Sequence, residues 1–194
     1  MLEFTAEDHS YRLNGVSLPS VTQCTGLLCD YGNIPPAVLQ AACDFGTNVH
    51  RATELFDLDD LDEDALSPAL APWLDGWKRF KNESGFLVRD IESRVYSKTY
   101  GYAGTLDRVG VLNGKLVIID IKTPTVVNPS TGPQTAAYQH AVEEMNKEKI
   151  KGRYALQLKG DGTYRLIPYA DKNDFNVFLG CLNVINFRRK HHGK

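Results

Sequence analysis

The sequence predicts an α/β fold in which helices flank a central mixed β-sheet. Runs of apolar and β-branched residues, separated by Asn-Gly or Asp-Gly turns, predict strands within residues 2–18, 89–124 and 153–169. Apolar residues at helical spacing predict helices between and after these strands. Consecutive strands, a helix, two further strands and a last helix are the order expected for a mixed sheet covered by helices.

The N-terminal part is expected to be mainly helical after one short hairpin that turns at Asn14-Gly15. Pro35-Pro36 can open a first helix, and Ser67-Pro68 can open a second helix that ends at Gly85. Both helices carry an apolar stripe and should therefore face a core. The predicted stripes are Val38, Ala42, Phe45, Val49, Ala52 and Phe56 in the first helix, and Leu70, Trp73, Leu74, Trp77 and Phe80 in the second.

The C-terminal half is expected to form the sheet. A strand near Arg89–Ser97 precedes the long hairpin Gly101–Pro124, which turns at Asn113-Gly114, and a later hairpin turns at Asp161-Gly162. A Pro-rich loop and a helix from Pro133 to about Lys147 separate the two hairpins, and Asp171 can cap a last helix. We predict one domain over residues 1–190, divided into a mainly helical part (1–85), the sheet with its helix (86–170) and a C-terminal helix (171–190), followed by a basic tail (191–194).

The composition is that of a soluble globular protein. Of 194 residues, 42% are hydrophobic and 24% are charged, and the net charge of −2 gives no global nucleic-acid signature. Binding of a polyanion would therefore need a local basic patch, with a metal ion helping to neutralise charge. No apolar run has the length of a membrane span, the start lacks a signal-peptide pattern, and the four cysteines form no CxxC pair. We expect an intracellular, cytoplasmic protein with free thiols.

Two charged segments have a plain interpretation. The acids between Asp57 and Asp64 are expected to form a solvated loop, because their spacing lacks the glycine of a calcium-binding loop. The basic C-terminus is either a frayed tail or a phosphate-binding extension.

The most informative segment is the hairpin around Asn113-Gly114. A two-residue turn there makes Asp107 face Asp120 and Thr105 face Lys122. Side chains alternate along a strand, so Asp107, Asp120 and Lys122 share one face while the isoleucines beside Asp120 enter a core. Two facing carboxylates repel each other unless a cation or a proton lies between them. The register therefore predicts a metal site with a lysine beside it, at the end of a buried strand.

Several motifs together resemble the PD-(D/E)XK nuclease superfamily, in its RecB-like branch with phage and mitochondrial genome maintenance exonucleases. Asp107 in Gly104-Thr105-Leu106-Asp107-Arg108, followed by Asp120-Ile121-Lys122, resembles the two strand motifs. Gln134 and Tyr138 match a Gln-x-x-x-Tyr helix, and Gly46-Thr47-Asn48-Val49-His50 resembles an upstream helix motif whose histidine binds metal. Further matches are Glu92 in the preceding strand and Pro19-Ser20-Val21-Thr22 near the start.

The resemblance implies a restriction-endonuclease-like core and a site for one or two Mg²⁺ or Mn²⁺ ions. Its implied metal ligands are His50, Asp107, Asp120 and the carbonyl of Ile121, and its implied catalytic residues are Asp107, Asp120, Lys122 and Glu92. The implied DNA contacts are Gln134, Tyr138, Ser20, Thr22, Thr123 and Arg108. An iron–sulfur cluster, which some relatives carry, is not expected, because only Cys181 lies in the C-terminal part.

Each of these positions also has a structural interpretation. Lys122 could form a salt bridge with Asp120, and Glu92 could pair with Arg94 or Lys98. Helical histidines such as His50 are often surface residues. Tyr138 could be a core residue and Gln134 a cap, and Ser20 and Thr22 could serve a cap or a turn. The helix aromatics are expected in the core, with base stacking as the alternative.

The resemblance implies a metal-dependent DNA exonuclease that uses a metal-activated water, in phage-type recombination, repair or replication. Its expected partners are single- or double-stranded DNA with a free end and an annealing or recombination protein, with no membrane. The alternatives are an endonuclease of the same fold, such as a restriction or junction-cleaving enzyme, and a non-catalytic nucleic-acid-binding protein. The sequence leaves these alternatives open.

Overall fold

The computed structural model describes residues 1–32 and 34–192, apart from the side chain of His192, and contains two β-sheets. The small sheet is antiparallel in the order β1-β2-β3, and the large sheet has the order β4-β5-β6-β7-β8. Only the β6–β7 pair of the large sheet is parallel, which confirms the predicted mixed sheet. The strands are β1 (Leu2–Thr5), β2 (Ser10–Leu13), β3 (Val16–Leu18), β4 (Leu87–Ser97), β5 (Tyr102–Leu112), β6 (Lys115–Lys122), β7 (Gly152–Leu158) and β8 (Tyr164–Pro168).

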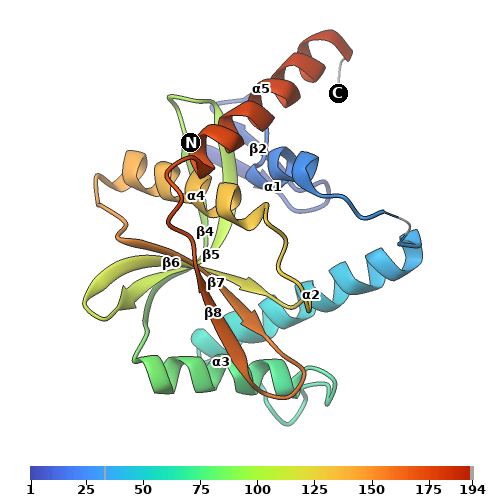
Figure 1. Cartoon of the computed structure of the whole chain (residues 1–194), viewed down its shortest axis with the longest axis vertical. Helices are drawn as coiled ribbons and strands as arrows, with labels where there is room; N and C mark the ends of the chain where they lie inside the picture. Colours follow the sequence, from blue (N-terminus) through green and yellow to red (C-terminus); the bar gives the residue numbers. More distant parts are fainter. Residues whose placement is uncertain (33, 193–194) are drawn as a thin grey trace.

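Helices cover both faces of the large sheet (Figure 1). α2 and α3 pack on one face, and α1, α4 and α5 pack on the other. None of the helices in the described ranges is long and apolar enough to cross a membrane. The helices are α1 (Val21–Thr25), a 3₁₀ turn (Gly26–Leu28), α2 (Pro36–Asp57), α3 (Ala71–Ser84), α4 (Thr131–Asn146) and α5 (Asp174–His192).

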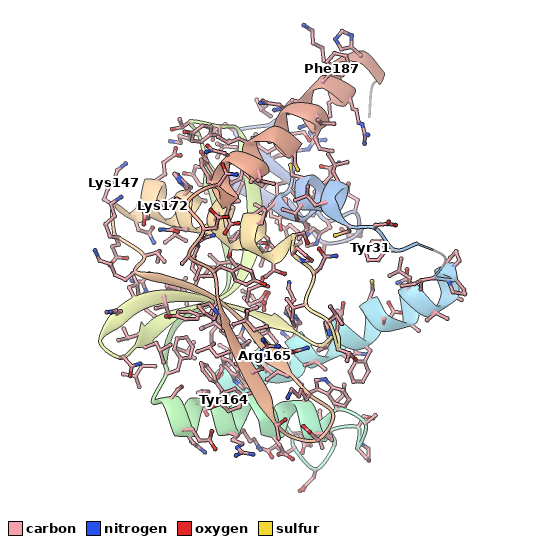
Figure 2. All side chains as sticks on the ribbon, in the orientation of Figure 1. Tyr31, Lys147, Tyr164, Arg165, Lys172 and Phe187 are labelled. Atoms are coloured by element: carbon pink, nitrogen blue, oxygen red, sulfur yellow. The ribbon has the colours of Figure 1, made fainter. Side chains whose placement is uncertain are left out.

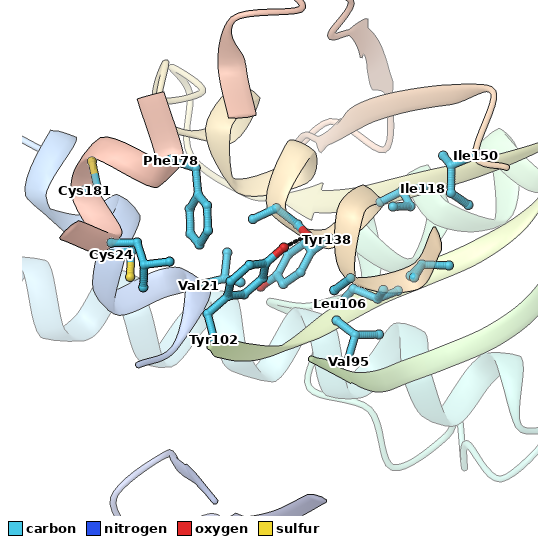
Figure 3. Packing of buried hydrophobic residues seen from close by; sticks show 14 of the residues in the cluster. Val21, Cys24, Val95, Tyr102, Leu106, Ile118, Tyr138, Ile150, Phe178 and Cys181 are labelled. Carbon is cyan, nitrogen blue, oxygen red and sulfur yellow. Dashed lines mark hydrogen bonds between the residues drawn. The ribbon is translucent and has the colours of Figure 1, made fainter. Parts of the chain in front are cut away.

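One core lies between the sheet and the helices α1, α4 and α5 (Figure 3). Tyr102 is fully buried there, donates a hydrogen bond of 2.8 Å to the Ala137 carbonyl, and meets the Phe178 ring edge to face at 4.7 Å between centroids. Burial and the neighbouring Cys181 raise the pKa of the Cys24 thiol to about 12. Both cysteines are free thiols, as are Cys29 and Cys43.

The second core lies between the sheet and the helices α2 and α3. Ile119 and Ile121 of β6 are fully buried there, which confirms the predicted alternation along this strand. Trp77 and Phe80 are also fully buried, as their helical spacing predicted. Trp73 differs from them because it is only partly buried at the margin of this core.

Three local expectations are corrected. α3 begins at Ala71 and not at Ser67-Pro68, because residues 68–70 form a turn that precedes the helix. Val38 and Ala42 are exposed, since the N-terminal half of α2 extends beyond the sheet (Figure 1).

The third correction concerns the termini of the chain. Helix α1 was not expected, and Ser20 caps it by accepting a hydrogen bond of 2.9 Å from Gln23 N. At the other end, α5 continues to His192, so the helix extends into the predicted tail 191–194. Residues 193–194 of that tail lie outside the described residues.

We predict that Gly110→Ala destabilises the protein by about 1–3 kcal/mol through overpacking. A Cβ at Gly110 would collide with the Leu87 carbonyl oxygen and lie 2.5 Å from the Phe86 ring. Gly180→Ala in α5 is the matched control, because its Cβ would meet nothing within 4 Å and alanine favours helix by up to about 1 kcal/mol. Urea unfolding measures both changes, and equal midpoints for the two variants would contradict the packing at Gly110.

Candidate functional site

The site forms where β5 and β6 stop pairing. Their register runs from Leu112↔Lys115 to Arg108↔Ile119, as the turn at Asn113-Gly114 predicted. The ladder ends there because one oxygen of Asp107, and not a backbone carbonyl, accepts a 2.6 Å hydrogen bond from Ile121 N. We therefore correct the expectation that the next pair, Asp107 and Asp120, face each other as ladder partners.

Thr105 is not paired with Lys122 either. Its hydroxyl lies 2.8 Å from the hydroxyl of Tyr11, a fully buried side chain of the N-terminal sheet. The small sheet therefore contacts β5 two residues before Asp107.

His50, Glu92 and Asp107 bring possible metal ligands together. Each offers one ligand atom, and these atoms lie within 4.8 Å of one another. His50 Nδ1 is 3.4 Å from Asp107 Oδ1, and His50 Nε2 is 3.1 Å from the Ile121 carbonyl oxygen. The helix α2 thus brings His50 to the Asp107 and Ile121 positions named by the sequence. Glu92 joins this group, whereas Asp120 lies outside it.

Asp120 instead lies beside the lysine. Asp120 Oδ2 is 2.6 Å from Lys122 Nζ, and Lys122 Nζ also donates a 3.2 Å hydrogen bond to Gln134 Oε1. Asp120 is almost completely buried, and its Oδ2 accepts no hydrogen bond of good geometry among the described residues. The salt bridge considered from the sequence is present, together with a contact from the Gln-x-x-x-Tyr helix to the lysine.

The protonation states of these groups depend on one another. Burial, together with the nearby Asp107 charge, raises the pKa of Glu92 to about 7. Burial also raises the pKa of Asp120 to about 6, with Lys122 opposing that shift. Burial disfavours ionised Asp107 too, but His50 and Lys122 outweigh it and lower the pKa of Asp107 to about 2. Burial thus disfavours the charged forms of Glu92 and Asp120, and perturbed carboxyl pKa values of this kind are common in functional sites.

Arg108 contacts this group from the interior, where it is buried against α2 and α3. It is fully buried, and its Nε donates a 2.7 Å hydrogen bond to Asp57, whose side chain is also fully buried. Its Nη1 lies 3.1 Å from Glu92 Oε1 and donates a 2.7 Å bond to the Asp107 carbonyl. We therefore correct the expectation that Arg108 contacts DNA, because its guanidinium is inaccessible and occupied by Asp57, Glu92 and Thr53.

Glu92 has an unusual backbone. Its φ is +45°, inside strand β4, between Ile91 and Ser93, which pair with Arg108 and Leu106. A non-glycine residue in this region costs about 1–3 kcal/mol and persists only where its surroundings hold it. The contact with Arg108 is one such constraint, and it directs the Glu92 carboxylate toward Asp107.

The other expected DNA contacts lie in different environments. Tyr138 is buried in the first core and is therefore inaccessible to DNA in this structure, but its hydroxyl lies 3.5 Å from Nε2 of Gln134, the residue that contacts Lys122. Ser20 is buried and caps α1, while Thr22 is exposed. Thr123 is partly exposed at the end of β6, and Gln134 contacts Lys122, so both lie next to the site.

Gly46 lies where α2 approaches the end of β6. A Cβ there would lie 3.4 Å from Thr123 Oγ1, which is an ordinary contact. The structure therefore does not require glycine at this position.

Asp57 is the site residue that the sequence analysis missed. It was assigned to the solvated acidic loop, but it is the last residue of α2 and accepts bonds from Trp77 Nε1, Lys81 Nζ and Arg108 Nε. Its spacing of seven residues from His50, with Thr53 between them, places all three on one face of a helix. That spacing is the signal that could have found it.

Comparison of the sequence with protein-family models and with curated proteins gives no match. Among solved structures, a "putative exonuclease" from Eubacterium rectale has a TM-score of 0.54 at 11% identity, covering 77% of this chain and 68% of that chain. An alkaline exonuclease from Laribacter hongkongensis has a TM-score of 0.40 at 14% identity, covering 90% of this chain and 93% of that chain. The same enzyme in complex with dAMP has a TM-score of 0.40 at 14% identity, covering 91% of this chain and 94% of that chain. The Eubacterium rectale structure confirms the predicted fold, and activity has to be argued from the site.

We predict that Asp57→Asn destabilises the protein by about 3–5 kcal/mol, because it removes the fully buried one of the two carboxylates that pair with the buried Arg108 charge. Asp64→Asn removes an exposed acid from the same part of the sequence and should change stability by no more than about 0.5 kcal/mol. The measurement is the midpoint of urea unfolding at neutral pH. A midpoint for Asp57→Asn that equals that of Asp64→Asn would show that the buried pair contributes nothing.

Proposed function

We propose that this protein is a metal-dependent DNA exonuclease that hydrolyses phosphodiester bonds with a metal-activated water. One observation carries the proposal: a partly buried group of His50, Glu92 and Asp107 lies beside the Asp120–Lys122 pair at the C-terminal end of β6. Carboxylates, an imidazole and a lysine in one site suit phosphoryl-transfer chemistry, in which positioning and charge stabilisation dominate.

The residues present fit a divalent cation. Carboxylate and carbonyl oxygens are preferred by Mg²⁺, and Mn²⁺ also accepts an imidazole. Asp107, Glu92, His50 and the Ile121 carbonyl would hold the ion, and Asp120 Oδ2, buried without a well-formed hydrogen bond, is a further acceptor beside them. A bound divalent ion lowers the pKa of a water molecule and polarises a phosphodiester.

The residues around this group have separate roles in the proposal. Lys122, held between Asp120 and Gln134, would place its charge against the negative charge that develops on the phosphate oxygens. The pKa of Lys122 is raised because its two aspartate neighbours outweigh the effect of burial, so the ammonium is charged at neutral pH. Arg108 is a positioning residue, because it contacts Glu92 and the Asp107 backbone from the buried side of the sheet.

The finer parts of the proposal come from the family resemblance. These are the choice of exonuclease over endonuclease, the Mg²⁺ or Mn²⁺ requirement, the phage-type recombination, repair or replication setting, and a protein partner. The two experiments below test the catalytic claim and the requirement for a DNA end.

We predict that Asp120→Asn and Lys122→Met each lower single-turnover cleavage of end-labelled DNA by at least about 10²-fold with Mg²⁺ or Mn²⁺. Lys122→Met keeps the length of the side chain and removes its charge. Lys115→Ala, an exposed lysine at the opposite end of β6, is the control and should cleave at the wild-type rate. Thermal unfolding of each variant separates lost chemistry from lost structure. Wild-type rates in folded Asp120→Asn would show that cleavage does not depend on this site and would reject the catalytic assignment; a folded wild-type protein that binds DNA but cleaves none would leave the non-catalytic nucleic-acid-binding role.

A second prediction concerns DNA ends. The wild-type protein should degrade linear single- or double-stranded DNA and leave covalently closed circles of both kinds intact. Gel electrophoresis over the same time course, with a chelator as the blank, measures this difference. Cleavage of closed circles would reject the exonuclease in favour of an endonuclease of the same fold.

A further inference from the structure

A cavity of about 420 Å³ opens directly beside the proposed active site. Its size falls within the roughly 300–1,000 Å³ of ligand-binding pockets. Thr123 follows Lys122 in the chain, so the cavity begins where the site ends. We call it the hairpin cavity, because it is lined by the tip of the β7–β8 hairpin together with Trp73 and the loop after β6: Trp73, Thr123–Thr125, Gln157–Asp161 and Arg165.

Strand register connects the cavity to the catalytic lysine. Lys122 pairs with Gln157 of β7, and Gln157 pairs with Arg165 of β8. Partners on neighbouring strands place their side chains on the same face, so these three residues form one row across the sheet. Strands lie about 4.8 Å apart, which places the Arg165 backbone roughly 10 Å from that of Lys122. Gln157 donates hydrogen bonds of 2.7 and 2.8 Å to the carbonyls of Pro124 and Thr125, fixing the cavity wall between them.

The cavity is suited to an anion. Lys159 and Arg165 are exposed, and neither forms an ion pair with any residue that the structure describes. The one acid in the lining, Asp161, accepts bonds of 2.9 and 2.6 Å from the backbone and hydroxyl of Thr163. Figure 2 shows Arg165 on β8, apart from Lys147 and Lys172, which lie at the upper left of the view.

An aromatic wall completes the cavity. Trp73 meets Phe45 edge to face at 4.8 Å, and a Cβ at Gly160 would come within 2.8 Å of its ring, so glycine leaves room for the indole. The indole nitrogen of Trp73 has no hydrogen-bond partner among the described residues, whereas that of the fully buried Trp77 donates to Asp57. Trp73 is only partly buried and lines the cavity, whereas Trp77 is fully buried in the core.

We propose that the hairpin cavity binds one unpaired nucleotide of single-stranded DNA next to the bond being cleaved. Arg165 and Lys159 would contact its phosphates, and Trp73 would contact its base. Cationic grooves with an aromatic wall bind single strands in this way, because every base has a face that can stack. This assignment rests on the proposed nuclease function, since it takes the Lys122 end of the row as the position of the scissile phosphate.

The first test measures binding without turnover. A labelled oligothymidine of about ten nucleotides is titrated into the protein in chelator, and its Kd is measured at several salt concentrations. The double variant Lys159→Ala/Arg165→Ala should bind about tenfold more weakly. Its plot of log K against log salt should be shallower by about 1.4, because each single-strand phosphate contact contributes about 0.7. The matched control is Lys115→Ala/Lys172→Ala, which removes two exposed lysines that do not line the cavity.

The second test measures the tryptophan. The chain contains two tryptophans, so quenching of intrinsic fluorescence by the oligonucleotide should come from Trp73 and disappear in Trp73→Phe. Phenylalanine keeps an aromatic wall, and thermal unfolding checks that the variant is folded. Quenching that persists unchanged in Trp73→Phe would remove the base contact from the proposal.

Steady-state kinetics distinguish a failure of the cavity assignment from a failure of the proposed nuclease function. With Mn²⁺ and a labelled single strand, Lys159→Ala/Arg165→Ala should raise KM about tenfold and leave kcat within about twofold. If the wild-type protein cleaves no DNA, the proposed nuclease function is wrong, and the binding titration alone tests the cavity. If the wild type cleaves and the double variant matches its control in Kd, salt slope and KM, the cavity assignment is wrong. If the double variant loses affinity equally for a covalently closed circular duplex, the preference for an unpaired strand is wrong.

Discussion

The buried ion pair between Arg108 and Asp57 is the interaction on which the rest of the site depends. It joins the end of α2 to β5, and the same two side chains reach Trp77 and Lys81 on α3 and Glu92 on β4. A buried charge pair offers little net stability compared with an apolar pair, because both ions lose their hydration. Its effect here is geometric: four elements that are distant in the sequence are held in one arrangement around Glu92 and Asp107.

The strained backbone of Glu92 fits this view. Its left-handed conformation lies within strand β4, and the Arg108 guanidinium contacts the Glu92 carboxylate. The interior face of the sheet and its strand ends thus have different electrostatic environments. On the α2 and α3 face, Arg108 and Asp57 are dry and fully paired, whereas at the strand ends the carboxylates are crowded and only partly neutralised.

Local patterns predicted most of the fold. The Asn113-Gly114 turn set the β5–β6 register, Gly85 ended α3, and the spacing of Trp77 and Phe80 identified a core face. The failures came from tertiary geometry. Val38 fits a helical stripe but lies where α2 has left the sheet, and Asp57 looks like its acidic neighbours until Arg108 folds against it. Sequence spacing contains no information about where a sheet stops or which buried cation an acid meets.

The same limit applied to the site. The sequence named His50, Asp107, Asp120 and Lys122 and the region where they gather, but it placed Asp107 opposite Asp120 in a continued ladder. Whether a ladder continues depends on competition between backbone and side-chain acceptors for one N–H group, and here the Asp107 carboxylate holds the Ile121 amide. Gln134 and Tyr138 are a second example. They share one face of α4, yet Gln134 contacts Lys122 whereas Tyr138 is buried in the core.

That competition has a practical consequence for Ile121. Its N–H belongs to a central strand, yet its hydrogen-bond partner is a side-chain oxygen of the site and not a neighbouring backbone. The rate at which this single amide exchanges with deuterated solvent therefore depends on whether the Asp107 carboxylate is in place. In a protein with no bound substrate, nuclear magnetic resonance at one backbone position can report on the organisation of the whole site.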